Sequence, residues 1–241
     1  MPQSEIRTSG RTLKKEILNL LCSDKFEQNI GLILKYPHQR TVNALFSFFY
    51  PANEEQYRQG IPMRSVTVLG RVMDQMAMKN MESARVVMRR LMWNLNDESG
   101  GIGWGSPEAM GEIMAVNKHL AEEYHHILIS YIWPGGNFLE HEGLQAGLLW
   151  GLGRFAHARP EFVQDIAGLL MPFMKSNRAD LRGLAVWAAG AVNDPAINPL
   201  LKSLINDKIS IRIFIKNQFE QFTIGRLAIQ SLSRPEKEIK S

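Results

Sequence analysis

The feature that most constrains this chain is a segment near its C-terminal end that recurs after about thirty residues. Residues 177–185 (Asn-Arg-Ala-Asp-Leu-Arg-Gly-Leu-Ala) are echoed by residues 207–215 (Asp-Lys-Ile-Ser-Ile-Arg-Ile-Phe-Ile), with Arg182 and Arg212 at the same place. In both copies an apolar run of helical character follows the arginine. A period of roughly 20 to 50 residues built from helix pairs is typical of α-solenoids. The sequence therefore predicts an all-α repeat architecture.

Apolar residues recur at helical spacing along most of the chain, and Pro, Gly or Asn-Asp interrupts them at short intervals. The best-marked start is at Ser106, because Ser106 can cap, Pro107 suits the first helical turn, and Glu108 and Glu112 favour the positive end of the helix dipole. We find no strand-like alternation and no Asn-Gly hairpin signal. After three short helices before residue 51, the expected helices cover residues 62–78, 81–95, 106–116, 118–133, 139–157, 160–175, 179–192, 195–206, 209–218 and 220–232.

Three consecutive motifs in the C-terminal half resemble a known repeat. They are Asp180-x-Arg182-x-x-Ala185-x-x-x-Ala189-Gly190, then Asn193-Asp194-Pro195-Ala196, then Leu200-Leu201-x-x-Leu204. Residues 139–233 resemble the short HEAT-type repeats of the phycobilisome-lyase-like class. The resemblance implies a HEAT/armadillo-like, right-handed α-solenoid of about five to six antiparallel helix pairs, in which the second helices line a concave face. It implies no single activity, because most such proteins bind other proteins and a few are enzymes.

Composition predicts one folded domain. The chain has 241 residues, of which 45% are hydrophobic and 22% charged, as in folded rather than disordered proteins. We expect a solenoid over residues 11–233, a disordered tail at 1–10 and a flexible tail at 234–241. The first residues lack an apolar signal segment, the apolar runs are too short to span a bilayer, and the single Cys22 fits a reducing compartment. These features predict a soluble, cytoplasmic protein.

Charge is distributed unevenly. Residues 101–142 contain one lysine against six acids, a net charge of −5, whereas residues 201–241 contain eight Lys or Arg against four acids. A protein that binds duplex nucleic acid usually carries a continuous basic stripe. The acidic centre therefore disfavours nucleic acid as a partner. We expect another protein or a small ligand instead, and no membrane contact.

One segment interrupts the helical array with four glycines, two tryptophans and several acids, and it is our first candidate site. Glycines allow positive φ and close approach, while indole rings beside a free helix N-terminus can stack a ligand and orient it. The alternative is a structural linker. The candidate binding residues in and beside this segment are Trp93, Asn94, Asn96, Asp97, Glu98, Trp104, Glu108 and Glu112.

The expected helix 139–157 adds Trp150 and Arg154, which would form a stacking and cationic pair on the face opposite its apolar side. Gly143, Ala146 and Gly147 share that face, so the alternative is close helix packing.

The residues favour a non-enzymatic scaffold that binds a protein segment or small ligand on its concave face, with no cofactor. The alternative is a metal-dependent or acid–base enzyme that uses a polar stripe of His119, Glu122, Glu123 and His126, because these residues at i, i+3 and i, i+4 spacing can contact one ion. A solvated face with local ion pairs explains the same pattern. A further alternative is a HEAT-like DNA-repair glycosylase, which the acidic centre disfavours.

Overall fold

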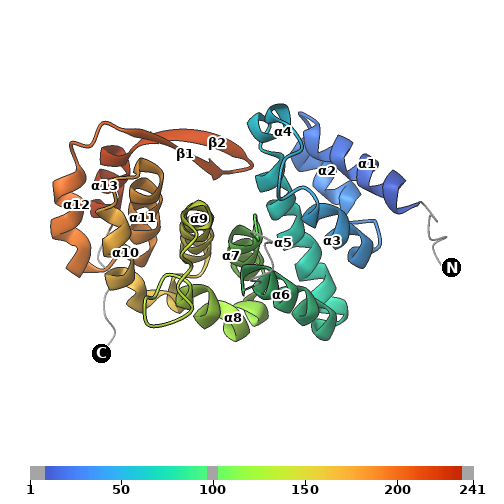
Figure 1. Ribbon diagram of the computed structural model, residues 1–241, viewed down its shortest axis with the longest axis horizontal. Helices are drawn as coiled ribbons and strands as arrows, with labels where there is room; N and C mark the ends of the chain where they lie inside the picture. The colour runs from blue at the N-terminus through green and yellow to red at the C-terminus, as the bar shows by residue number, and fades with distance from the viewer. Residues whose placement is uncertain (1–8, 97–102, 235–241) are drawn as a thin grey trace.

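The computed structural model describes residues 9–96 and 103–234, which form a curved stack of helices with one β-hairpin (Figure 1). The helices are α1 (Gly10–Cys22), α2 (Phe26–Ile33), α3 (His38–Phe46), α4 (Glu54–Arg58), α5 (Ile61–Lys79), α6 (Met81–Asn96), α7 (Ser106–Val116), α8 (Lys118–Ser130), α9 (Glu142–Ala158), α10 (Ala167–Met174), α11 (Ala179–Val192), α12 (Asn198–Leu204) and α13 (Ile224–Leu232). Short 3₁₀ turns occur at Pro160–Phe162, Gln164–Ile166 and Pro195–Ile197.

Helices α5, α7, α9, α11 and α13 form one continuous layer. Helix α5 packs on α7, α7 on α9, α9 on α11, and α11 on α13, while α6, α8, α10 and α12 connect them (Figure 1). Helices α7, α9 and α11 are apolar around almost their whole circumference, as expected for helices covered on several sides. The fold is therefore the all-α, HEAT/armadillo-like solenoid that the sequence predicted.

Helices α7 and α9 approach until their backbones touch. A Cβ atom added at Gly111 of α7 would overlap the carbonyl group of Gly151 in α9. A Cβ atom added at Gly151 would lie 2.5 Å from the carbonyl oxygen of Pro107. Neither position can hold a side chain at this helix separation, so these glycines set how closely the two central helices pack.

The structure corrects the sequence analysis at residues 209–223, where two helices were expected. Strand β1 (Ser210–Ile215) pairs antiparallel with β2 (Gln218–Thr223), and only then does α13 begin. The segment Ser-Ile-Arg-Ile-Phe-Ile alternates exposed and buried residues up to its fourth position and is rich in β-branched side chains, which favour strands. Lys216 and Asn217 connect the strands with φ angles of 47° and 64°, as a two-residue type I′ turn requires.

The recurrence that suggested the repeat is consequently not a structural repeat. Arg182 lies on α11, where its Nε donates to Asp207 Oδ2 at 2.9 Å. Arg212 lies on β1, with its guanidinium carbon 4.4 Å from the centre of the Phe219 ring. The two arginines occupy different environments, although the architecture that they suggested is the correct one.

The hairpin joins the two ends of the described chain. It extends from the C-terminal helices across to α4 (Figure 1). At its tip, Asn217 Nδ2 donates to Glu27 Oε1 of α2 at 3.0 Å. The ring of Phe219 lies beside Gly60, at the start of α5. The hairpin therefore connects the C-terminal part of the described chain to the N-terminal helices directly, in addition to the stack.

Other boundaries differ less. The expected helix 160–175 begins as two 3₁₀ turns before α10, and α4 was not expected. The predicted tails at 1–10 and 234–241 fall almost wholly outside the described residues, and the domain limits stay a prediction. Within the described part of the chain, no helix is both long enough and apolar enough to cross a bilayer.

Candidate binding pocket

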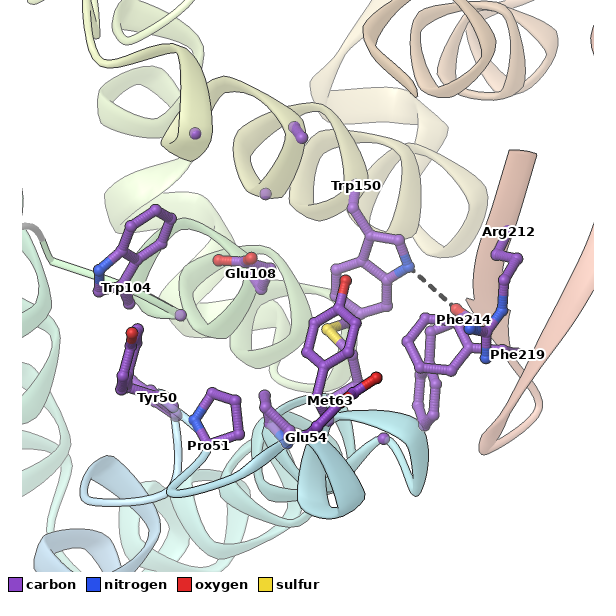
Figure 2. Close-up of a pocket in the computed structure, with 18 of the residues that line it drawn as sticks. Tyr50, Pro51, Glu54, Met63, Trp104, Glu108, Trp150, Arg212, Phe214 and Phe219 are labelled. Carbon is purple, nitrogen blue, oxygen red and sulfur yellow. Dashed lines mark hydrogen bonds between the residues drawn. The ribbon is translucent and has the colours of Figure 1, made fainter. Parts of the chain in front are cut away.

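A cavity of about 720 Å³ opens between the helical layer and the hairpin (Figure 2). The starts of α5 and α7, the first half of α9, the connection from α3 to α4, and both strands form its wall. Its volume falls within the range of roughly 300 to 1,000 Å³ that is usual for small-molecule sites. Most of the wall is apolar and aromatic, and a few polar groups reach it, which is the composition expected of a binding site.

Glu108 is the acid inside this cavity. It lies in the first turn of α7, where Gly105 precedes the helix with a φ of 75°. Its Oε2 atom is shielded from solvent and has no hydrogen-bond partner among the described residues, while the rest of the side chain is partly open to the cavity. Desolvation raises the pKa of Glu108 to about 7, and its own backbone amide opposes this shift. The carboxyl group of Glu108 therefore ionises near neutral pH, well above the usual range for a glutamate.

Aromatic rings stand on both sides of this carboxyl group (Figure 2). The ring of Trp104 lies 6.4 Å from that of Tyr50 and meets His141 edge to face at 5.5 Å. On the other side, Trp150 Nε1 donates to the carbonyl oxygen of Phe214 in β1 at 2.9 Å. This hydrogen bond fixes the indole of Trp150 against the hairpin and leaves its ring in the cavity wall.

Glycines of α9 make room for the side chains of α7. A Cβ atom at Gly143 would lie 2.7 Å from the Trp104 ring, and one at Gly147 would overlap the carboxyl group of Glu108. Residues four apart lie on one face of a helix, so Gly143, Gly147 and Gly151 form a single shallow groove. The glycines that the sequence analysis singled out as possible packing positions therefore also hold Trp104 and Glu108 in place.

Of the other residues predicted for the site, some lie away from the cavity. Trp93 is on the surface with 72% of its area exposed. Asn94 lines a separate, smaller cavity with Arg90, and Asn96 ends α6. Asp97 and Glu98 lie outside the described residues.

Glu112 and Arg154 pair with each other below the cavity. Arg154 Nε donates to Glu112 Oε2 at 2.6 Å, across the contact between α7 and α9. Burial raises the pKa of Glu112, and Arg154 opposes this shift. Both residues are one turn beyond the ones that line the cavity, which is why the sequence placed them in the same site.

The residues that complete the cavity wall from distant parts of the chain were not predicted from the sequence. Tyr50, Pro51 and Met63 come from the N-terminal side, and Phe214 and Phe219 come from the hairpin. No local pattern marks them, because only the tertiary fold brings them together.

The polar stripe on α8 forms ion pairs. Arg85 donates two hydrogen bonds to Glu123, at 2.8 and 2.6 Å, and His119 lies 3.4 Å from Glu122. The ring of His126 lies 5.6 Å from that of His125. Over residues 9–96 and 103–234, no three His, Cys, Asp or Glu side chains converge as a metal site requires. The enzyme alternative based on this stripe stays a prediction.

The fold is shared by solved structures, while sequence comparison identifies no relative. No protein-family model and no curated protein matches the chain. An engineered protein from the Northeast Structural Genomics Consortium superposes with a TM-score of 0.52 and 13% identity, covering 94% of this chain and 91% of its own. A designed armadillo repeat protein in complex with the peptide (KR)4 gives a TM-score of 0.51 and 13% identity, covering 90% and 97%. These similarities confirm the HEAT/armadillo-like solenoid fold.

Proposed function

We propose that this chain is a non-catalytic binding protein whose cavity takes a small ligand or a side chain of a protein segment. The observation that carries the proposal is the Glu108 carboxyl group, which lies between two indole rings and whose shielded Oε2 atom has no hydrogen-bond partner among the described residues. A buried polar group left without a partner costs about 1–3 kcal/mol, and a bound ligand that supplies the partner recovers this cost. Retaining such a group in an apolar wall is typical of a binding site.

Two further features support the proposal. The hairpin, the connection from α3 to α4, and helices α7 and α9 all contribute to the wall of the cavity, so a bound group is contacted from several sides. The designed armadillo repeat protein noted above is in complex with a peptide, so a solenoid of this kind can present a peptide-binding surface. In this chain the hairpin narrows that surface to a pocket of about 720 Å³, which suits a compact group.

The five tryptophans provide a test. Indole ¹H–¹⁵N spectra are recorded while the protein is mixed with a chemically diverse fragment library and a random peptide pool. We expect some components to shift the Trp104 and Trp150 signals but not those of Trp93 and Trp133, which are 72% and 52% exposed. If no component shifts either pocket signal, the proposal is wrong.

A pair of variants on one helix provides the control. Ala146→Phe places a ring in the cavity and should abolish the shifts, whereas Ala158→Phe adds the same ring at the exposed end of α9 and should leave them intact. Circular dichroism establishes that both variants are folded. Shifts that survive Ala146→Phe would place binding elsewhere.

A further inference from the structure

We infer that the cavity selects an organic cation, in which an ammonium or guanidinium N–H group on an apolar stem bonds the Glu108 carboxylate between Trp104 and Trp150. This inference rests on the proposed function and names the chemical class of its ligand. The surroundings of Glu108, the charges in the cavity wall and the arrangement of the rings all point to this class.

Glu108 differs from the paired acids of this protein. Arginine forms an ion pair with each of those acids, as Arg154 does with Glu112 and Arg85 does with Glu123. Within the described ranges Glu108 forms no ion pair, and its Oε2 atom has no hydrogen-bond partner. The helix start also limits movement, because Gly147 and the α9 backbone stand directly behind the carboxyl group. Its remaining open direction is the cavity.

Besides Glu108, the cavity wall carries the charged side chains of Arg212 and Glu54. Arg212 is exposed and stacked on Phe219 at 4.4 Å, and it makes no ion pair among the described residues. Glu54 lies at the rim and pairs with Arg58 at 2.6 Å. Tyr50 and Tyr57 contribute neutral phenol groups to the wall, and the ring of His141 contacts that of Trp104 edge to face. Glu108 is therefore the acid of the wall at which a ligand cation gains most, because no ion pair neutralises it within the part of the chain that the structure describes, whereas Arg58 already pairs with Glu54.

The aromatic rings of the wall also favour a cation. A cation within about 6 Å of an indole face gains roughly 0.5 to 2 kcal/mol, and the gain is larger where water is excluded. Trp104 and Trp150 flank the carboxyl group, so one ligand nitrogen can contact the acid and a ring at once (Figure 2). The apolar stem then lies along Met63 and Phe219. At Glu108 this combination favours a cation over a neutral polar ligand.

Protonation links this site to pH. Burial raises the pKa of Glu108 to about 7 in the free protein, so a bound cation must displace the proton from molecules in which the carboxyl group is protonated. Cation affinity should therefore rise from pH 6 to pH 8, as the carboxyl group ionises. Binding near pH 7 should release protons.

The test uses matched probes and matched variants. Phenethylamine is compared with 2-phenylethanol, which has the same stem without the charge, by titration of the Trp104 and Trp150 indole signals. A blocked pentapeptide with a central lysine is compared with the same peptide carrying norleucine, which distinguishes a peptide-borne cation from a free amine. Glu108→Gln removes the acid without changing its size, and Glu54→Gln is the control at the rim.

We expect an amine or the lysine peptide to bind at least tenfold more tightly than its neutral analogue. Glu108→Gln should remove that preference, and Glu54→Gln should change it less than twofold. Calorimetry in buffers of different ionisation enthalpy should show the released proton. Equal affinity for charged and neutral probes, or a preference that survives Glu108→Gln, would overturn the inference. If neutral library components bind in the pocket as tightly as cationic ones, the proposed function stands and only the preference for cations is refuted.

Discussion

The contact between α7 and α9 allows a sharp test of the packing. Gly111→Ala adds one methyl group that must overlap the carbonyl group of Gly151. The obstacle is backbone, so no side-chain rotation relieves it and the two central helices must separate. Overpacking of this kind costs typically 1–3 kcal/mol, and we take the upper end because both contacting groups are main chain. The higher helix propensity of alanine raises the free energy of unfolding by about 1 kcal/mol relative to glycine.

The expected net loss is therefore about 2 kcal/mol of unfolding free energy, or a Tm lower by roughly 4–8 °C for a chain of this size. Urea denaturation followed by circular dichroism measures it. The matched control is Gly31→Ala, in the exposed part of α2, where nothing lies within 4 Å of the new methyl group. That variant should gain about 0.5–1 kcal/mol. If Gly111→Ala is as stable as Gly31→Ala, the two backbones do not touch and the account of this contact is wrong.

Three further predictions concern charge and the hairpin. Because the folded-state pKa of Glu108 is raised from 4.5 to about 7, its contribution to stability is complete below pH 4.5 and is lost as pH rises to about 7, by up to about 3 kcal/mol. Glu108→Gln should remove that loss in urea titrations at pH 4 and pH 8, and an unchanged difference between the two pH values would contradict the raised pKa. Arg154→Met leaves Glu112 buried and unpaired, so it should cost about 3 kcal/mol at pH 8 and less at pH 5, and adding Glu112→Gln should restore most of the loss. Lys216→Asn should raise the unfolding free energy by about 0.5 kcal/mol, because asparagine tolerates the positive φ that Lys216 adopts, and a loss measured by the same assay would exclude a type I′ turn.

Much of the helical layer was predictable because its signals are local. The apolar periodicity between residues 62 and 192 and the cap at Ser106 depend on near neighbours in sequence, and α5 to α9 and α11 follow them closely. The hairpin was not predicted because the thirty-residue recurrence favoured a helix at 209–218, although the alternation at 210–213 is the pattern of a strand.

The pocket was partly predictable for the same reason. Trp104, Glu108 and Trp150 stand out because glycines surround them in the sequence, and all three line the cavity. Tyr50 and Phe219 carry no such signal, because they meet only when the hairpin folds back over the N-terminal helices. Local pattern identifies one wall of a cavity, and the opposite wall depends on the topology of the chain.

The hydrogen bond from Asn217 to Glu27 joins residues 190 positions apart. In an open solenoid each module interacts only with its neighbours, and the terminal modules can unravel while the middle stays intact. Here the hairpin near the C-terminal end contacts the helices near the N-terminal end. Local unfolding of either region therefore also exposes surface of the other region to solvent. We expect unfolding to be a single concerted event, and the rate of folding to be limited by the slow encounter of segments distant in sequence.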